Sequence, residues 1–247
     1  MSNTMATPTV AWQITPQGDR TLLLRFGDQI DVAIGQHCAA AAATLRAAQI
    51  AGVTDIVPAF STVAVHYQPR LFGASTTFQH LTKEIDRILN SAPATPIRDG
   101  NEQTSSRPID IPVCYGGEYG PDLSYVAGHC QLDESEVIRL HSDSQAFVFM
   151  LGFAPGAPYI GLHDQKLAIP RRATPRTALP AGSVAIANRQ TLIYPNVSPG
   201  GWHIIGMTPL VLFDPERTRP SLFSPGDIVR FVPIERDEFL ALKKELS

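Results

Sequence analysis

Residues 10–92 alternate between short apolar runs and longer segments with helical periodicity. Three runs are compatible with β-strands, at residues 20–26, 53–57 and 62–67. In the last run, Val63, Val65 and Tyr67 alternate with smaller or polar residues, as expected for a strand with one buried face. The pattern therefore predicts three strands in this region.

Two helices are predicted between and after these strands. Asp31 is suited to cap a helix that starts at Val32 and continues through an alanine-rich stretch to about Ala51, before Gly52. Within residues 75–90, apolar residues recur every three or four positions: Phe78, Leu81, Ile85, Ile88 and Leu89. Strands and helices in this order predict a ferredoxin-like α+β module over the whole region.

The apolar periodicity stops after residue 92. Residues 93–108 contain three prolines, one glycine and several serines and threonines, without a regular apolar spacing. This composition is typical of a linker, so we expect a domain boundary there.

From residue 109 onwards, short apolar runs are separated by proline and glycine. They lie at residues 109–113, 147–153, 184–187, 191–194, 210–213 and 228–232. Closely spaced short strands of this kind favour either a closed β-barrel or a β-sandwich over residues 109–234. Residues 235–247 are expected to form a helical tail. Together the patterns predict an α+β protein with two domains.

Two short helices are expected early in the second domain. Asp122 is suited to cap the first, and Asp133 with Glu136 resembles a capping box that opens the second. His129 and Cys130 are neighbours on the first helix and would point in different directions. We therefore interpret them as ordinary helix residues, and we expect no metal site.

Composition and charge narrow the class of protein. The 247 residues are 44% hydrophobic and 17% charged, as in a soluble globular protein. A net charge of −3 disfavours binding to nucleic acid. No apolar run reaches the roughly 18 residues that a membrane span needs, and the polar N-terminus does not resemble a signal peptide. Three cysteines without a CxxC pair indicate reduced thiols in a cytoplasmic protein.

Motifs for a complete active site are absent from the sequence. There is no G-x-x-x-x-G-K-[ST] phosphate loop, no G-x-G-x-x-G after a strand and no G-x-S-x-G elbow. Ser183 follows a glycine but lacks the second half of such an elbow. For this reason no catalytic residue is assigned.

Positive charge is concentrated in one segment of the second domain. Between Asp164 and Asp214 there is no acidic residue, but five basic residues occur: Lys166, Arg171, Arg172, Arg176 and Arg189. Guanidinium groups bind carboxylate and phosphate oxygens through two parallel hydrogen bonds, so this segment is a candidate anion site. The alternative is a solvated basic face, or a contact with an acidic partner.

Two loops rich in glycine and proline belong to the same domain. Residues 152–159 (GFAPGAPY) and 198–203 (SPGGWH) combine stiff prolines with glycines that allow close approach, and such loops often line a site. The candidate substrate- or anion-binding residues are Arg171, Arg172, Arg176, Gln190, Tyr159 and His203. Of these, we expect Arg172 and Arg176 to hold an anionic group, with the glutamine and the tyrosine as neutral donors nearby.

The second domain also carries a series of motifs in one order. They are IDIPVCYGGEYGPDL (109–123), HS (141–142), GFAPGAPYIG (152–161), PRRATPR (170–176), PAGSV (180–184), QT (190–191), YP (194–195), SPGGW (198–202) and PGDIVRFVP (225–233). These motifs resemble the family of 5-oxoprolinase B subunits, also known as allophanate hydrolase subunit 1 and as the sporulation-kinase inhibitor family. The resemblance covers nearly all of residues 109–234, whereas the first domain agrees in layout only.

The resemblance implies a cyclophilin-like β-barrel for the second domain. It implies the B subunit of an ATP-dependent 5-oxoprolinase, which opens the lactam 5-oxoproline to glutamate. The implied partners are a homologous cyclophilin-like C subunit and an A subunit as the third component, with ATP and Mg²⁺ bound only in the complex and the isolated chain inactive. Two alternatives stay open: a protein inhibitor of a sensor histidine kinase, and a carboxyltransferase-like module acting on urea or a related amide.

Several positions depart from the family pattern that the resemblance implies. Ala157 stands where phenylalanine is expected, and His203 stands where glutamine is usual. Around the QT motif, Asn188, Arg189 and Leu192 occupy a region where the family usually has glycines. Because arginine and leucine side chains fill space near the expected pocket, the true lactam or amide substrate stays open.

Overall fold

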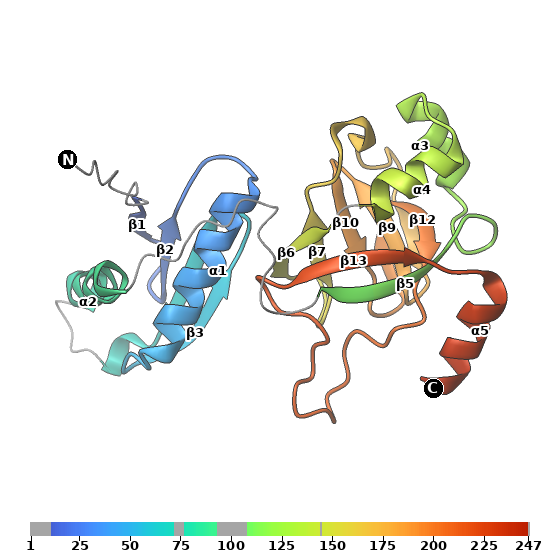
Figure 1. Cartoon of the computed structure of the whole chain (residues 1–247). Helices are drawn as coiled ribbons and strands as arrows, with labels where there is room; N and C mark the ends of the chain where they lie inside the picture. The colour runs from blue at the N-terminus through green and yellow to red at the C-terminus, as the bar shows by residue number, and fades with distance from the viewer. Residues whose placement is uncertain (1–10, 72–76, 93–107, 144, 247) are drawn as a thin grey trace, which may run out of the picture. The chain divides into compact units, whose positions relative to one another are not determined.

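The computed structural model describes residues 11–71, 77–92, 108–143 and 145–246. The chain divides into two compact units, Met1–Gln103 and Thr104–Ser247, which we call the N-terminal unit and the C-terminal unit (Figure 1). The linker predicted at residues 93–108 lies outside the described residues, apart from Pro108. Its position therefore stays a prediction.

The N-terminal unit is a four-stranded antiparallel sheet with two α-helices (Figure 1). The strands lie in the order β1-β2-β4-β3. The elements are β1 (Gln13–Pro16), β2 (Thr21–Arg25), α1 (Val32–Ala47), β3 (Val53–Pro58), β4 (Thr62–Tyr67), the 3₁₀-helix η1 (Pro69–Leu71) and α2 (Thr77–Ser91). Strands and helices share one hydrophobic core, to which both helices and the three strands β2, β3 and β4 contribute buried side chains.

Local sequence explains the two helices of this unit. Asp31 caps α1 as predicted, because its Oδ1 accepts hydrogen bonds from two backbone N–H groups of the first turn at 2.8 and 3.2 Å. The helix ends at Ala47, earlier than predicted, and Gln49 then adopts a left-handed φ of 47°. In α2, Leu81 and Ile85 lie one turn apart and are fully buried, as the amphipathic pattern requires.

The connectivity of this sheet bears on its classification. Strand β4 lies between β2 and β3 and is antiparallel to both, so β2-α1-β3 is a split β-α-β arrangement. The free side of β2 is paired with β1, which precedes β2 in the chain and was not predicted. The ferredoxin-like classification of this unit stays a prediction.

The C-terminal unit contains a closed seven-stranded β-barrel, which decides between the barrel and the sandwich expected from the sequence. Neighbouring strands follow the closed order β10-β7-β6-β13-β5-β12-β9. The strands are β5 (Ile109–Tyr115), β6 (Ala146–Leu151), β7 (Pro158–Gly161), β9 (Ser183–Ala187), β10 (Gln190–Ile193), β12 (His203–Met207) and β13 (Ile228–Pro233). The pairing of β5 with β13 is parallel and the other pairings are antiparallel.

Helices and a small second sheet surround the barrel. They are α3 (Leu123–Cys130), α4 (Glu134–Ser142), the 3₁₀-helix η2 (Gln165–Leu167), the two-stranded sheet of β8 (Arg176–Leu179) and β11 (Ser198–Gly200), and α5 (Arg236–Glu245). Helix α5 lies where the helical tail was expected. The strands β7, β8, β11 and β12 were not predicted as separate elements.

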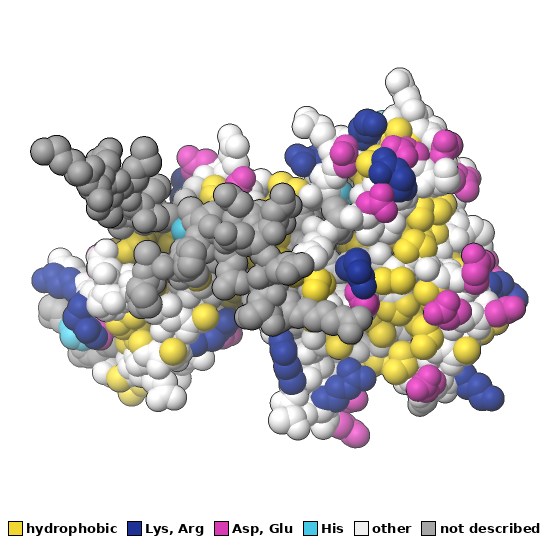
Figure 2. All heavy atoms as spheres, in the orientation of Figure 1, with side chains coloured by type: hydrophobic (Ala, Val, Ile, Leu, Met, Phe, Trp, Pro, Cys, Tyr) yellow, Lys and Arg dark blue, Asp and Glu magenta, His cyan; other side chains and the backbone are white. Residues whose placement is uncertain are grey.

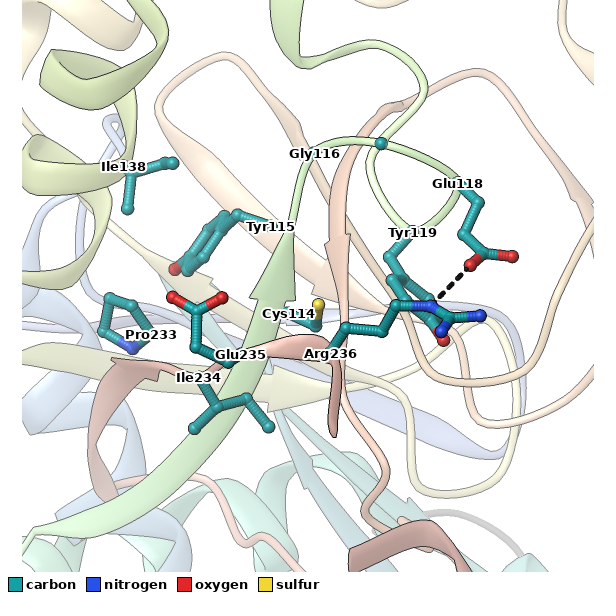
Figure 3. A pocket seen from close by; sticks show the side chains of 11 residues that line it. Cys114, Tyr115, Gly116, Glu118, Tyr119, Ile138, Pro233, Ile234, Glu235 and Arg236 are labelled. Carbon is teal, nitrogen blue, oxygen red and sulfur yellow. Dashed lines mark hydrogen bonds and ion pairs between the residues drawn. The ribbon is translucent and has the colours of Figure 1, made fainter. Parts of the chain in front are cut away.

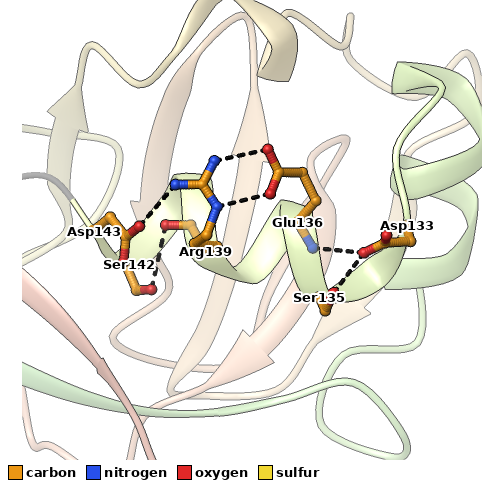
Figure 4. Close-up of polar contacts among 6 residues, drawn as sticks. All are labelled: Asp133, Ser135, Glu136, Arg139, Ser142 and Asp143. Carbon is orange, nitrogen blue, oxygen red and sulfur yellow. Dashed lines mark hydrogen bonds and ion pairs between the residues drawn. The ribbon is translucent and has the colours of Figure 1, made fainter.

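Helix α4 begins at a cap that the sequence predicted (Figure 4). Asp133 Oδ1 accepts a hydrogen bond from the backbone N–H of Glu136 at 2.8 Å. The Glu136 carboxylate does not return to the cap but binds Arg139 through two bonds of 2.7 Å, and Arg139 also reaches Asp143 at 2.9 Å. These contacts tie the exposed side of a short helix together.

One predicted strand is wrong. Residues 210–213 form no strand, and within the described part of the chain they contribute only an isolated bridge between Phe213 and Ser221. The apolar character of the run has another cause, because Leu212 is buried in the barrel core and Leu210 packs against it. Leu210 and Leu212 thus contribute to the barrel core without joining its hydrogen-bonded wall, while Val211 and Phe213 are exposed.

The surface of the C-terminal unit is not uniformly polar. Figure 2 shows hydrophobic side chains on the face where β13 and β5 lie in front in Figure 1, together with acidic and basic side chains. The ion pair between Arg230 of β13 and Asp110 of β5 lies on these two strands. In the part of the chain that the structure describes, no helix is both long enough and apolar enough to span a membrane.

Candidate functional site

Asp122 is the centre of a buried charged group in the C-terminal unit. This residue is 4% exposed, and its carboxylate accepts hydrogen bonds from three residues. Arg176 donates two, from Nη1 to Oδ2 at 2.6 Å and from Nη2 to Oδ1 at 2.8 Å. Arg172 donates one from Nη1 at 3.0 Å, and the backbone N–H of Ile204 donates one at 2.8 Å. We call Asp122, Arg172 and Arg176 the Asp122 cluster.

The backbone around Asp122 explains why it reaches these arginines. Gly120 lies so close to β12 that a Cβ atom there would be 2.1 Å from the Ile205 carbonyl oxygen, so only glycine fits. The backbone N–H of Asp122 then donates to the Ile204 carbonyl at 2.9 Å. Asp122 precedes α3 as predicted, but its side chain does not cap that helix. The carboxylate turns towards the arginines instead.

The charge of Asp122 is set by two opposing effects. Burial alone would raise the pKa of its carboxyl group, but the hydrogen bonds from Arg176 and Ile204 and the two nearby guanidinium groups hold that pKa below its usual value. The same contact raises the pKa of Arg176. Arg172 and Arg176 therefore have an anion within the chain, and their binding of a ligand anion stays a prediction.

Arg171 has a different environment from its two neighbours. It is exposed, and its guanidinium carbon lies 5.4 Å from the centre of the Trp202 ring. Tyr159 meets the same indole edge-on, with ring centres 5.9 Å apart. Within the described residues Arg171 makes no ion pair with a carboxylate. We call Arg171, Tyr159 and Trp202 the Arg171 group.

The charge of Arg171 affects the pKa values of two nearby tyrosines. Burial raises the pKa of Tyr159, and Arg171 opposes that rise. Burial also raises the pKa of Tyr194 to about 12, and Arg171 again acts in the opposite direction. The Arg171 charge is thus directed at a largely buried aromatic surface that carries two neutral hydroxyl groups.

Strand register places Gln190 on the same side of the barrel wall as Tyr159. Leu192 is paired with Tyr159, and Gln190 is paired with Gly161 two residues further along each strand. Gln190 is 7% exposed, and a Cβ atom at Gly161 would come 3.4 Å from its Cγ. The tightest neighbour of such a Cβ atom would be the Arg189 carbonyl oxygen at 3.2 Å, so the glycine lets β7 lie close to the turn before β10.

His203 belongs with the Asp122 cluster. Its Nε2 lies 3.0 Å from the Pro170 carbonyl oxygen, so Nε2 carries the proton and donates. Its ring stacks on the exposed ring of Tyr125 at 5.3 Å. Burial lowers the pKa of His203, and the bond to Pro170 partly offsets this. The predicted site residues thus form two groups, with Arg172, Arg176 and His203 in one and Arg171 and Tyr159 in the other.

The positions that depart from the family pattern lie next to this surface. Asn188 and Arg189 form the two-residue turn between β9 and β10, with φ values of 50° and 65°. Left-handed backbone is unusual for arginine, and Arg189 is held by a bond from its Nε to the His163 carbonyl at 2.9 Å. Leu192 is buried beside Tyr159, and Ala157 is fully buried.

Ser183, the potential metal ligands and the partner of the arginines are the remaining points raised by the sequence. The hydroxyl of Ser183 is buried and donates to the Pro180 carbonyl at 2.7 Å. Across the residues that the structure describes, no group of three or more His, Cys, Asp and Glu side chains is placed to hold a metal ion. Sequence reasoning missed Asp122 as the partner of the arginines, because it lies 50 and 54 positions before them.

Comparison with known proteins places this arrangement in a family. The family model described as carboxyltransferase domain, subdomain C and D, matches residues 12–223. The 5-oxoprolinase B subunit of Bacillus subtilis (strain 168) is 40% identical over 245 residues, which cover 96% of this chain and 99% of that protein. The chain belongs to the family of 5-oxoprolinase B subunits.

Solved structures extend the likeness of this 5-oxoprolinase family member to the fold. The crystal structure of TTHA0988 has a TM-score of 0.74 at 35% identity, over 87% of this chain. The present chain spans only 40% of that longer chain. The Kluyveromyces lactis urea carboxylase has a TM-score of 0.72 at 18% identity, over 95% of this chain and 23% of its own, which shows a shared fold alone.

Proposed function

We propose that this chain is the B subunit of an ATP-dependent 5-oxoprolinase complex, in which it helps to open 5-oxoproline to glutamate. The observation that carries the proposal is the 40% identity to a 5-oxoprolinase B subunit across 99% of that protein. The matched range includes the N-terminal unit, for which the sequence motifs gave no support.

The chemistry of a lactam explains what such a site has to supply. A lactam carbonyl is a poor electrophile, and phosphorylation of its oxygen by ATP creates a leaving group that water can displace. The step needs cations against the phosphoryl charge and donors for the substrate carboxylate. The Arg171 group offers one guanidinium without a carboxylate partner in the described residues, beside a tyrosine hydroxyl.

The Asp122 cluster has a supporting role in this proposal. Because Arg172 and Arg176 are bound to Asp122, they fix the segment from which Arg171 extends. The backbone N–H of Arg172 also donates to the Gly201 carbonyl at 2.7 Å, which holds Arg171 next to Trp202. Gln190, on the side of the barrel wall that carries Tyr159, is the second neutral donor in the proposal.

ATP with Mg²⁺ is expected only in the assembled complex. The residues present fit an anion. Arg171 is exposed, lies over the ring of Trp202 and has no carboxylate partner among the described residues. Among the described residues, no group of three or more His, Cys, Asp and Glu side chains could hold the metal ion. We therefore propose that the metal ligands come from the partners, a homologous C subunit and an A subunit as the third component.

A component of a complex needs a face for its partners. Figure 2 shows hydrophobic side chains on the face where β5 and β13 lie, and these strands also carry the exposed ion pair of Arg230 with Asp110. We propose this mixed face for the partners, since protein interfaces combine apolar and polar side chains. The finer fold names, cyclophilin-like for the barrel and ferredoxin-like for the N-terminal unit, belong to the same proposal, as does a cytoplasmic location.

Reconstitution with the partner proteins tests the proposed function. The chain alone should form no glutamate from 5-oxoproline and ATP, and the complex should form it at a measurable rate. Arg171→Ala should lower kcat/KM of the complex at least about tenfold, equivalent to about 1.4 kcal/mol. Lys166→Ala is the matched control, because Lys166 is an exposed cation of the same acid-free segment.

Three results would argue against the proposal. Turnover by the chain alone would show that a complete active site has been missed. An Arg171→Ala complex within threefold of the wild type would remove the Arg171 group from the site. An inactive complex, together with a chain that lowers autophosphorylation of a sensor histidine kinase, would favour the inhibitor function.

A carboxyltransferase-like module is the second candidate function. The observation in its favour is the family model, whose description is carboxyltransferase domain, subdomain C and D. This candidate predicts transfer of a carboxyl group from a carboxybiotin carrier to urea or a related amide. The assay is release of free biotin carrier from labelled carboxybiotin in the presence of each amide, with the Arg171→Ala complex as the comparison.

A further inference from the structure

Four polar side chains form a continuous hydrogen-bonded chain in the barrel interior. The Tyr115 hydroxyl lies 2.6 Å from Nδ1 of His141, and Nε2 of His141 lies 2.8 Å from Oγ1 of Thr191. The same Thr191 oxygen lies 2.7 Å from Nε2 of His163. We call these four residues the histidine chain. It draws on β5, α4, β10 and the loop that follows β7.

The histidine chain is shielded from solvent at its centre. His141 and Thr191 are 0% exposed and His163 is 1% exposed. Phe231 packs on both imidazoles, with ring centres 4.1 Å from His141 and 6.0 Å from His163. Helix α4, which carries His141, is held by the contacts of Figure 4.

Both imidazoles are neutral in this environment. Burial lowers the pKa of His141 well below its usual value, and the neighbouring His163 lowers it further. Burial lowers the pKa of His163 to about 4, and the Arg189 charge acts in the same direction. Burial also raises the pKa of Tyr115, which keeps its proton. Each of the four residues therefore contributes one proton to the chain.

Counting these protons leaves two arrangements in which the Thr191 hydroxyl both donates and accepts. In the first, Tyr115 donates to His141, His141 to Thr191 and Thr191 to His163, which leaves a proton on His163 Nδ1. In the second every donation is reversed, and the spare proton is on the Tyr115 oxygen. The two imidazoles carry opposite tautomers in both arrangements. If both histidines donated to Thr191 instead, its own buried proton would have no acceptor among the contacts described, which is costly.

One end of the histidine chain opens to a cavity. Tyr115 lines a cavity of about 390 Å³ between the ends of β5 and β13 and the start of α5, and Figure 3 shows it there with Cys114 and Glu235. Water in this cavity is the proposed proton source for the Tyr115 hydroxyl.

The other end lies beneath the turn between β9 and β10. The backbone N–H of His163 donates to the Arg189 carbonyl at 2.8 Å, and Arg189 Nε donates back to the His163 carbonyl. Nδ1 of His163 is buried and has no partner among the described residues. A buried polar atom in this state is ordinarily bonded to a water molecule. Gln190 of the proposed site is the next residue to Thr191 in the same strand.

We propose that the histidine chain is a proton relay through the barrel, from the cavity at Tyr115 to a water molecule at His163 Nδ1. Starting from the first arrangement, the Nδ1–H proton of His163 passes to that water. Thr191 passes its proton to His163 Nε2, His141 passes its Nε2 proton to Thr191, and Tyr115 passes its proton to His141 Nδ1. Water in the cavity returns a proton to Tyr115. One proton enters, one leaves, and the second arrangement results.

The tautomers of the two histidines give a direct test on the whole chain. Histidine labelled with ¹⁵N reports which ring nitrogen carries the proton, and His141→Gln and His163→Gln variants assign the signals. At pH 7.5 the Nε2–H fractions of His141 and His163 should add up to one, because the tautomers are opposite in both arrangements. Equal tautomers with Nε2–H on both rings, or an imidazolium at either position, would overturn the relay.

Turnover of the reconstituted complex tests whether the relay is used, and this part rests on the proposed function. Thr191→Val removes the linking hydroxyl, and we expect kcat to fall at least about tenfold with a changed solvent isotope effect. Thr191→Ser should restore kcat to within threefold. Thr208→Val is the matched control, since Thr208 is a buried threonine of the same unit outside the histidine chain.

The possible results separate the relay from the proposed function. A Thr191→Val complex that unfolds more easily but keeps kcat and the isotope effect would show a structural network only, and would overturn the relay. A wild-type complex without 5-oxoproline turnover would count against the proposed function. In that case the tautomer measurement decides on the relay alone.

Discussion

Two buried polar groups of the C-terminal unit differ in charge: one is ionised and the other is neutral. Asp122 is 4% exposed and stays ionised, because two guanidinium groups and a backbone N–H more than offset the cost of its burial. His141 and His163 are as deeply buried and stay neutral, because their contacts within the described residues include no carboxylate. Burial alone therefore does not determine whether a group is ionised. The partners that the fold places next to each group determine its charge.

The largest effect on stability is expected when Asp122, the centre of the Asp122 cluster, is replaced. Asp122→Ala leaves two partly buried guanidinium groups and the Ile204 N–H without their acceptor. We expect the free energy of unfolding to fall by about 3–5 kcal/mol, measured by urea unfolding at neutral pH.

A matched pair at the surface gives the control for this variant. Arg230 binds Asp110 through two hydrogen bonds of 2.9 and 2.8 Å, but both side chains are well exposed. Asp110→Ala should cost less than about 1 kcal/mol. Equal losses in the two variants would remove the distinction between buried and exposed arginine pairs in this chain.

As the pH falls, the buried neutral histidines should lower the stability of the protein before Asp122 is protonated. An unfolded histidine binds a proton below about pH 6.5, whereas folded His163 does so only near pH 4. The unfolded state therefore binds more protons in this window, and the free energy of unfolding should fall as pH falls through it, by about 3 kcal/mol from His163. Asp122 stays ionised over the same window, since its pKa is lowered.

Unfolding in urea at pH 7.5, 6.5, 5.5 and 4.5 measures this dependence. The groups that face the two histidines are Tyr115, Thr191, Phe231 and Arg189, of which only Arg189 is charged. The His163→Gln variant should show a shallower decline than the wild type. A decline of the same slope in both proteins would assign the acid sensitivity to other groups.

A smaller loss is expected when the neutral group loses its central hydroxyl. Thr191→Val leaves Nε2 of His141 and of His163 without a partner in the barrel interior. We expect a loss of about 1–3 kcal/mol in the free energy of unfolding at pH 7.5. Thr177→Val, at an exposed position of β8, should change it by less than about 0.5 kcal/mol.

The smallest effect on stability is expected outside both groups. Arg171 is exposed and contacts only the face of Trp202 among the interactions described above. Arg171→Ala should lower the free energy of unfolding by about 0.5–1 kcal/mol. A loss as large as that of Asp122→Ala would make Arg171 a structural residue and would remove it from the proposed site.

The fold could be predicted where side-chain periodicity is local and regular. The amphipathic pattern of α2 and the alternation in β4 are both found in the structure. Strands β7 (PYIG) and β11 (SPG) were missed because proline and glycine make them resemble turns. The run at residues 210–213 was predicted as a strand because an apolar sequence does not say whether it pairs or only fills a core.

The candidate site could be predicted only in part. An acid-free run drew attention to Arg171, Arg172 and Arg176 together, although these three arginines do not share the same partners in the fold. Spacing along the chain carries no signal for Asp122, since the contact depends on how the loop before α3 meets β12. The histidine chain was missed for the same reason, because its members come from four separate segments.

The parallel pairing of β5 with β13 has a consequence for how the protein is made. β5 is the first strand of the barrel and β13 is the last, and β13 also pairs with β6. While the ribosome extends the chain, β5 and β6 are complete long before the strand that joins them exists. Among the described residues, the core of the N-terminal unit is complete once α2 has been made, so this unit has no such delay. The barrel therefore passes through a stage with two open strand edges during synthesis, the stage at which aggregation and chaperone binding are expected.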